Sequence, residues 1–379
     1  MNKKKLIMWL CILCCCATLS AQYGTLTSPI VGNDDSVTFR YYAPYAKSVL
    51  VNGQFMVGDI PLIKDDKGVW SVTVKPEKAD IYPYNFIVDG TRLNDPGNKL
   101  LSPTDAFKSS LLEMPDPDAL YTINPVPHGK VHYCTYRSHV LQQYRTVVIY
   151  TPAEYDLSAG KKYPVFYLLH GMGGDEEAWI ALGRTAQIMD NLIAQGKAKP
   201  MIVVMTNGNA DQEAAPGESS LGLVKPNMQL PKTMEGSMES SFPDVIKFIE
   251  SNYRVEKKKS SRAIAGLSMG GFHSLHISKQ YPDMFDYVGL FSAAILPREG
   301  SESPIYQNMD EKLKVQFGKH PKLYWIAIGK TDFLYKNNVD YRKKLDDNGY
   351  KYEYYESDGG HIWKNWRIYL TKFAPMLFK

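Results

Sequence analysis

A serine flanked by glycines is the residue of this 379-residue chain with the clearest potential for chemistry. It lies in the segment Gly266-Leu-Ser268-Met-Gly270, which has the pattern Gly-x-Ser-x-Gly. An apolar run at 263–265 precedes the serine and predicts a strand, and a helical pattern follows it. A tight turn between a strand and a helix lifts a serine hydroxyl above a sheet, and its glycines prevent clashes. We therefore expect Ser268 to be a nucleophile, and the alternative is a serine that only caps the helix.

A serine nucleophile needs a base, and in folds with such a turn the partners follow in the order serine, acid, histidine. Four histidines follow Ser268. His273 and His276 belong to the predicted helix after the serine, and His320 precedes a proline in a connecting loop. His361 follows a predicted strand and a pair of glycines, which places it on a loop at the carboxyl edge of the sheet. We predict that His361 is the base, so hydrolysis should fall as His361 becomes protonated in acid.

The acid of such a triad should follow the strand before the histidine. The apolar run Leu323 to Ile328 leads into Gly329-Lys330-Thr331-Asp332, and Asp332 is our choice. Its work would be to hold the tautomer of His361 and to stabilise the imidazolium that forms. The rivals are Asp358, which is close to the histidine in sequence, and Glu356. This chemistry needs no metal and no organic cofactor.

A second glycine-rich turn, His-Gly-Met-Gly-Gly at 170–174, follows another apolar run. We expect the backbone N–H groups of Met172 and Met269 to bind the oxyanion that develops during ester cleavage. Gly171 is the alternative donor for the first of these positions and a candidate for substrate contact. His170 is a candidate metal ligand by residue type, but the sequence offers no second ligand at a suitable spacing, so we expect it to be a structural histidine.

Substrate contacts are harder to predict than the triad. Trp179 and Trp363 are candidates for lining the pocket, and packing in the core is the alternative for each. A polar segment of about 35 residues, 207–241, follows a predicted strand. Loops of this length inside a compact domain are usually functional, so we expect it to shape the acyl or alcohol pocket.

The elements that must position these residues alternate between apolar runs and helical patterns from about residue 128 onward. This alternation predicts an α/β fold with a mostly parallel sheet and helices on both faces. The predicted strands are Val147 to Tyr150, Val165 to Leu169, Met201 to Met205, Arg262 to Ala265, Tyr287 to Phe291, Leu323 to Ile328 and Tyr352 to Tyr355, and the predicted helices are Phe242 to Tyr253, Gly270 to Tyr281, Val339 to Asn348 and Trp363 to Phe373.

The preceding part of the chain has a different pattern. Short β-type runs separated by turns fill residues 25–112, with Asp89-Gly90 as a hairpin turn. We predict a small all-β sandwich over 22–113, a proline-rich linker over 114–127 and a hydrolase domain over 128–379. The strands of the sandwich are expected at Ser36 to Tyr42, Ser48 to Asn52, Val69 to Val74 and Tyr82 to Val88.

The first 21 residues read as a secretory signal peptide. Three lysines are followed by an apolar run that ends in Leu19-Ser20-Ala21, so we expect cleavage after Ala21 and a secreted or periplasmic protein without stable membrane insertion. An uncleaved anchor and a lipoprotein are the alternatives. Removing those lysines leaves 41 basic residues of the original 44 against 40 acidic ones. This balance gives no electrostatic reason to expect nucleic acid as a partner.

These motifs together resemble a known family. The segments His170-Gly-Met-Gly-Gly174, Gly266-Leu-Ser-Met-Gly-Gly271, Gly329-Lys-Thr-Asp332 and Gly359-Gly-His361 are similar to those of the feruloyl and acetyl xylan esterases of carbohydrate esterase family 1, and of esterase D-like proteins. The resemblance covers about residues 127–379 and implies an α/β-hydrolase fold with Ser268, Asp332 and His361 as its triad.

The N-terminal part resembles the immunoglobulin-like module, of the glycogen-binding type, that often precedes such esterases. The similarity lies in Thr38-Phe-Arg-Tyr-Tyr-Ala-Pro44, Tyr82-Pro-Tyr-Asn-Phe-Ile-Val-Asp-Gly90 and Asn94-Asp-Pro96. The two resemblances imply a serine esterase that removes feruloyl or acetyl groups from plant cell-wall xylan. A siderophore trilactone esterase is one alternative, and a non-catalytic carbohydrate-binding protein with a vestigial hydrolase domain is another.

Overall fold

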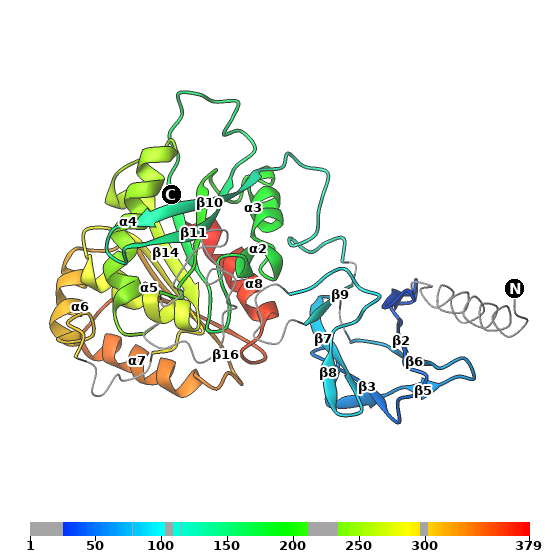
Figure 1. Ribbon diagram of the computed structural model, residues 1–379. Coiled ribbons are helices and arrows are strands. Elements are labelled where there is room, and N and C mark those ends of the chain that lie inside the picture. Colours follow the sequence, from blue (N-terminus) through cyan, green and yellow to red (C-terminus); the bar gives the residue numbers. More distant parts are fainter. Residues whose placement is uncertain (1–25, 78, 103–108, 115, 211–233, 296–301) are drawn as a thin grey trace, which may run out of the picture. The chain divides into compact units, whose positions relative to one another are not determined.

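The computed structural model describes residues 26–77, 79–102, 109–114, 116–210, 234–295 and 302–379 (Figure 1). These residues form two compact units. The first comprises the described residues up to Leu101 together with Ser109–Met114, and the second comprises Ser102 and the described residues from 116 onward. The predicted signal peptide and the middle of the polar segment 207–241 lie outside the described residues. Within the described ranges, no helix is long and apolar enough to cross a membrane.

The first unit is a β-sandwich. One sheet has the strand order β1-β2-β6-β5, and the other has the order β4-β3-β7-β8 with β9 paired to β7. Aromatic side chains fill the space between the sheets: the rings of Phe39 and Tyr84, one from each sheet, have centroids 4.9 Å apart. The strands are β1 (Ile30–Val31), β2 (Val37–Tyr42), β3 (Val49–Gly53), β4 (Asp59–Pro61), β5 (Ile63–Lys64), β6 (Val69–Val74), β7 (Ile81–Val88), β8 (Thr91–Leu93) and β9 (Ser110–Glu113).

The predicted hairpin turn joins β7 to β8. Val88 pairs with Thr91, and the two residues between them, Asp89 and Gly90, have φ values of 46° and 84°. A two-residue turn with positive φ at both positions suits the twist of the flanking strands. The turn prediction is therefore confirmed.

The second unit contains an eight-stranded mixed sheet of order β10-β11-β13-β12-β14-β15-β16-β17. The pairs β10–β11 and β11–β13 are antiparallel, and every other neighbouring pair is parallel. The strands are β10 (Lys130–Ser138), β11 (Gln143–Thr151), β12 (Val165–Leu169), β13 (Ile202–Thr206), β14 (Arg262–Leu267), β15 (Tyr287–Phe291), β16 (Leu323–Gly329) and β17 (Glu353–Ser357).

Helices cover both faces of this sheet, and each face has its own apolar core. Side chains of α4 (Ser237–Asn252), α5 (Met269–Gln280), α6 (Met309–Gly318) and α7 (Tyr335–Asp347) contribute to the core on one face. Those of α2 (Ala178–Ala181), α3 (Thr185–Ala194) and α8 (Trp363–Phe373) contribute to the core on the other. The predicted fold class, an α/β-hydrolase fold preceded by an all-β module, is confirmed.

Helix α3 was not predicted, and its surroundings explain why. Its buried positions include Asp190 and Asn191, so polar residues interrupt the apolar period. The Asp190 carboxylate accepts hydrogen bonds from the Tyr150 hydroxyl at 2.7 Å and the Gly129 amide at 2.9 Å. The Asn191 side-chain amide donates to the main-chain carbonyls of Leu120 and Thr122, which lie within the predicted linker. The described part of the predicted linker, from residue 116, thus packs on α3 as part of the second unit.

The sheet also determines where the predicted site residues lie. Because β12, β14, β16 and β17 are parallel, the segments that follow them emerge at one edge. The turn at 170–174 follows β12, and Ser268 follows β14. Asp332 follows β16, and His361 follows β17. The fold therefore collects all four motifs at the carboxyl edge.

Candidate active site

Ser268 occupies a sharp turn between β14 and α5. Its φ of 52° and ψ of −115° lie outside the regions that non-glycine residues prefer. Main-chain hydrogen bonds hold it there: its amide donates to the Phe291 carbonyl at 2.9 Å, and its carbonyl accepts from Phe272 at 3.0 Å and Ala294 at 2.9 Å. Strained backbone of this kind persists only where surrounding structure enforces it, and it is typical of a nucleophile elbow.

The glycines on either side of Ser268 are required by close approach of the backbone. A Cβ atom on Gly266 would lie 2.4 Å from the carbonyl group of Gly270. A Cβ on Gly270 would lie 2.4 Å from the carbonyl oxygen of Leu169, at the end of β12. Neither position has room for a side chain, so the Gly-x-Ser-x-Gly pattern follows from close packing within the turn at Gly266 and against the end of β12 at Gly270.

Asp332 and His361 form a hydrogen-bonded pair. The distance between His361 Nδ1 and Asp332 Oδ2 is 2.9 Å, and the other carboxylate oxygen accepts the Leu334 amide at 2.9 Å. Burial alone would raise the pKa of Asp332, but the hydrogen bonds from His361 and Leu334 outweigh it, so the pKa is lowered from its usual value. A carboxylate thus faces Nδ1, which leaves Nε2 of His361 as the nitrogen for the nucleophile.

Aromatic rings enclose His361 on two sides. The ring centroid of Trp366, a buried residue of α8, lies 4.9 Å from that of His361, and the Phe333 centroid lies 4.6 Å away. The His361 side chain keeps 18% of its surface exposed. In the described part of the chain, Ser268 Oγ has no hydrogen bond to His361. In enzymes, a hydrogen bond between a nucleophile and its base often tightens only in the substrate complex.

Asp358 and Glu356, the two alternatives to Asp332 as the acid, have different partners. Asp358 forms an exposed ion pair with Lys330 at 2.9 Å. Glu356 accepts hydrogen bonds from the hydroxyls of Tyr335 at 2.6 Å and Tyr354 at 2.7 Å. Only Asp332, among these three carboxylates, is paired with His361 in the described structure.

The predicted oxyanion turn lies against the elbow. A Cβ atom on Gly171 would lie 3.3 Å from Ser268 Cβ, and the Gly174 amide closes the turn on the Gly171 carbonyl at 3.1 Å. Met269 is buried, whereas Met172 is 43% exposed. Among the described residues, neither methionine amide donates a hydrogen bond to the protein. Both N–H groups are thus available for an incoming oxyanion.

His170 holds two loops at this edge. Its Nδ1 lies 2.7 Å from the Gly171 carbonyl oxygen, and its Nε2 lies 2.8 Å from the Gly208 amide. Burial lowers the pKa of His170 to about 4, so the ring is neutral at pH 7. One nitrogen therefore donates and the other accepts, which is the arrangement of a structural histidine. No group of three or more potential metal ligands occurs in the described part of the chain.

Trp179 and Trp363, the two candidates for lining the pocket, differ in burial: Trp179 is buried, whereas Trp363 is partly buried. Trp179 is only 1% exposed, and its indole N–H donates to the Leu169 carbonyl at 2.9 Å. Its ring meets that of Trp363 edge to face at 5.4 Å, and Trp363 in turn contacts Trp366 at 5.1 Å. The burial of Trp179 favours a role in packing over substrate contact. The ring contacts that run from Trp179 through Trp363 to Trp366 end at His361, which contacts Trp366.

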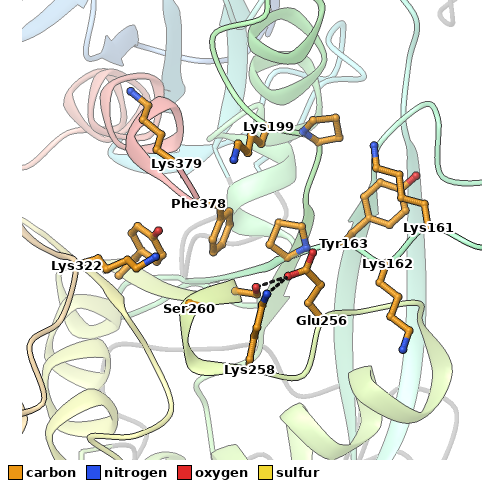
Figure 2. Close-up of a pocket in the computed structure, with 14 residues that line it drawn as sticks. Lys161, Lys162, Tyr163, Lys199, Glu256, Lys258, Ser260, Lys322, Phe378 and Lys379 are labelled. Atoms are coloured by element: carbon orange, nitrogen blue, oxygen red, sulfur yellow. Dashed lines mark hydrogen bonds and ion pairs between the residues drawn. The ribbon is translucent and has the colours of Figure 1, made fainter.

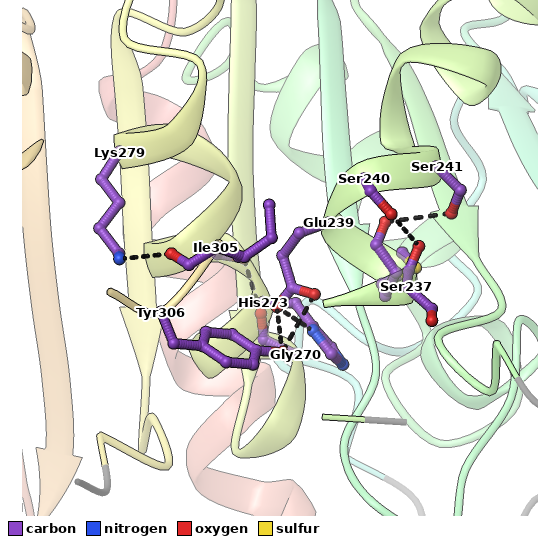
Figure 3. Close-up of polar contacts among 11 residues, drawn as sticks. Ser237, Glu239, Ser240, Ser241, Gly270, His273, Lys279, Ile305 and Tyr306 are labelled. Carbon is purple, nitrogen blue, oxygen red and sulfur yellow. Dashed lines mark hydrogen bonds and ion pairs between the residues drawn. The ribbon is translucent and has the colours of Figure 1, made fainter. Parts of the chain in front are cut away.

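A buried polar cluster supports the helix that begins at the elbow (Figure 3). The Glu239 carboxylate, on α4, lies 2.9 Å from Nδ1 of His273 on α5, and both side chains are almost fully buried. The Tyr306 hydroxyl lies 3.3 Å from each carboxylate oxygen. On the same helix, the Lys279 ammonium donates to the Ile305 carbonyl at 2.9 Å. Burial lowers the pKa of Lys279 to about 8.

The cavity drawn in Figure 2 is not part of this site. It has a volume of about 350 Å³ and is lined by residues at the amino ends of the parallel strands, among them Pro164 before β12 and Lys322 before β16. Six of its lining residues are lysines. Because the predicted site motifs lie at the carboxyl ends of the strands, this cavity belongs to the opposite edge of the sheet.

Two residues near the site were missed by the sequence motifs. Glu239 lies in the polar segment 207–241, which was expected only to shape a pocket, and its tertiary contact with His273 is what distinguishes it. Phe333 directly follows Asp332, and this adjacency is the signal that could have identified it. Its ring contact with His361 appears only in the structure.

Two family models match the chain. The model described as "Putative esterase" matches residues 138–377, and carbohydrate-binding module 48 (isoamylase N-terminal domain) matches residues 24–105. The chain therefore belongs to this esterase family and carries the module before it. These matches confirm the resemblance inferred from the sequence motifs.

Individual relatives extend the comparison. The chain is 33% identical over 364 residues to an endo-1,4-beta-xylanase/feruloyl esterase of Xylanibacter ruminicola, an alignment that covers 93% of this chain and 46% of the relative. It is 28% identical over 164 residues to an acetyl esterase of Caldicellulosiruptor saccharolyticus, covering 36% of this chain and 61% of the relative. The chain thus spans about half the length of the first relative and three-fifths of the second.

Solved structures show the same fold. A CE1 ferulic acid esterase of Anaeromyces mucronatus, in complex with ferulic acid, has a TM-score of 0.58 at 26% identity and covers 69% of this chain and 96% of its own. The enterobactin esterase of Shigella flexneri has a TM-score of 0.64 at 18% identity and covers 90% of this chain and 93% of its own. At that identity the second match establishes the fold alone.

Proposed function

We propose that this protein is a secreted or periplasmic serine esterase that removes feruloyl or acetyl groups from plant cell-wall xylan. The observation that carries the proposal is the Asp332–His361 pair at the same edge of the sheet as the strained Ser268 turn. The names of the relatives in Xylanibacter ruminicola and Caldicellulosiruptor saccharolyticus support the two acyl groups. The sequence of the first 21 residues supports export.

The reaction would proceed through an acyl-enzyme. Ser268 Oγ attacks the ester carbonyl while His361 Nε2 takes its proton. The amides of Met172 and Met269 stabilise the tetrahedral oxyanion, an effect worth roughly 3–4 kcal/mol per donor. His361 then returns the proton to the departing sugar alkoxide. Water then attacks the acyl-enzyme while His361 takes its proton. His361 gives this proton to Ser268 Oγ as the bond between the acyl carbon and Oγ breaks, and the free acid leaves.

The N-terminal module would have a supporting role. We propose the boundaries 22–113 for the module and 128–379 for the esterase domain, and the match to carbohydrate-binding module 48 supports a role for the module in carbohydrate binding. The alternative of a siderophore trilactone esterase rests on the fold match to the Shigella flexneri enzyme, at 18% identity. Export disfavours it, because such esters are expected to be cleaved inside the cell.

The deciding experiment compares the full-length wild type with Ser268→Ala. The acids released from acetylated and feruloylated arabinoxylan are identified by mass spectrometry, with enterobactin as a third substrate. We expect ferulate or acetate from the wild type and a rate at least about 10³-fold lower from the variant. Equal hydrolysis by both proteins would exclude the serine mechanism, and cleavage of enterobactin alone would favour the siderophore esterase.

A further inference from the structure

Phe333 has an unusual position for an aromatic side chain. It is 74% exposed, and it is the only phenylalanine of the described residues in that state. Its ring centroid nevertheless lies 4.6 Å from that of His361, with an angle of 52° between the ring planes. Phe333 therefore contacts the proposed base on one side and solvent on the other.

The backbone around Phe333 is fixed, although its ring is exposed. The Asp332 amide donates to the Gly329 carbonyl at 3.1 Å, and the Tyr335 amide donates to the Asp332 carbonyl at 2.9 Å. The next side chain, Leu334, is buried in a cluster with Met269 and Phe272. The turn thus directs Leu334 inward and leaves the ring of Phe333 at a defined place on the surface.

The chemistry of the reaction indicates which part of the substrate reaches this ring. His361 must protonate the leaving alkoxide, so the alcohol oxygen has to come within about 3 Å of its Nε2. The alcohol portion of the ester therefore lies next to the His361 ring. The acyl portion extends from the other side of the carbonyl carbon, near Ser268 and the buried cluster around Met269.

We propose that Phe333 is the stacking platform for the sugar ring that carries the ester, and so forms the leaving-group subsite. This inference rests on the proposed function. Sugar rings have an apolar face of C–H groups, and aromatic side chains at the mouth of a site offer them contact area with little loss of conformational entropy. Met172, which is 43% exposed beside the oxyanion turn, gives this edge a second apolar surface.

The test uses two esters that share an acyl group and differ in the alcohol. One is feruloylated arabinoxylo-oligosaccharide and the other is methyl ferulate. If the wild type prefers acetyl esters, acetylated xylo-oligosaccharide and ethyl acetate take their place. The variants are Phe333→Ala, Phe333→Tyr and, as the matched control, Tyr133→Ala, which removes an aromatic ring that is 64% exposed on β10.

In Phe333→Ala, we expect the ratio of kcat/KM for the oligosaccharide ester to that for the methyl ester to fall about tenfold, through KM. Phe333→Tyr should restore the ratio to within about twofold of the wild type, and Tyr133→Ala should leave it unchanged. An unchanged ratio in Phe333→Ala would overturn the proposal. Equal losses on both esters, or a shifted acid limb of the pH profile, would also overturn it, because Phe333 would then act through His361.

The same experiment distinguishes this inference from the proposed function. If the wild type cleaves both esters but Phe333→Ala has the same ratio of kcat/KM values as the wild type, the esterase proposal stands and the subsite proposal fails. If the wild type cleaves no feruloyl or acetyl ester at all, the function fails and the subsite with it.

Discussion

The carboxylate of Asp332 is hydrogen-bonded at both oxygens, to His361 Nδ1 and to the Leu334 amide, each at 2.9 Å. The second bond fixes the carboxylate in the turn that begins α7, and the first fixes the imidazole. The orientation of His361, the proposed base, is therefore determined by the turn between β16 and α7 and by the loop that follows β17.

Replacing Asp332 by Asn should lower kcat by about 10³- to 10⁴-fold. The amide nitrogen can donate to Nδ1, which would favour the tautomer with its proton on Nε2 and remove the acceptor that Ser268 needs. The measurement is steady-state kinetics with an aryl ester. Asp358→Asn is the matched control, because Asp358 pairs with Lys330 and not with the imidazole. A larger loss in the control than in Asp332→Asn would reassign the acid.

Gly270→Ala should destabilise the esterase unit. The new methyl group would lie 2.4 Å from the Leu169 carbonyl oxygen and 2.5 Å from that of His170, so β12 and the elbow would have to separate. We expect a loss of about 1–3 kcal/mol in urea unfolding, with lower activity. Gly318→Ala in α6 is the control, since nothing lies within 4 Å of its added Cβ. Equal stability of the two variants would contradict this account of the turn.

Local sequence patterns were sufficient to predict where the proposed triad residues lie in the fold. The Gly-x-Ser-x-Gly motif and the strand-like runs before Ser268, Asp332 and His361 placed all three at one edge, because parallel strands expose their carboxyl ends together. Patterns could not identify α3, whose buried Asp190 and Asn191 hide its apolar period. They also could not reveal contacts between distant segments.

Helix starts show a related limit. The expected start of α4 was five residues too late and that of α7 four residues too late, compared with Ser237 and Tyr335. Neither start is marked by a side-chain cap. Instead, α4 follows Gly236 at a φ of 99°, and α7 follows the Asp332 turn. Both signals depend on backbone conformation that tertiary contacts enforce.

Breaking the buried Glu239–His273 pair should cost more than breaking an ion pair at the surface. Glu239→Ala removes the hydrogen-bond partner of His273 Nδ1 in a site closed to water, so we expect a loss of about 1–3 kcal/mol in the free energy of unfolding. Asp340→Ala, which breaks the exposed pair with Lys336 at 2.7 Å, should cost less than about 0.5 kcal/mol. Urea unfolding of both variants measures this difference, and losses of similar size would refute it.

His170 should make the stability of the protein depend on pH. Burial lowers its pKa from 6.5 in the unfolded chain to about 4 in the native state. Between these values the unfolded chain binds a proton that the native state does not, so the free energy of unfolding decreases as the pH falls from 6.5 to 4. The interval corresponds to about 3 kcal/mol.

Other groups titrate in the same range, so the test compares the wild type with His170→Gln at each pH. The variant should be less stable at pH 7, because Gln holds the Gly171 and Gly208 loops less well, but it lacks the titrating ring. The stability advantage of the wild type should therefore shrink steadily from pH 7 to pH 4 in urea unfolding. If the advantage of the wild type stays constant over this range, His170 binds its proton in the folded state as readily as in the unfolded chain. That result would contradict the proposal that a neutral His170 ring bridges the two loops.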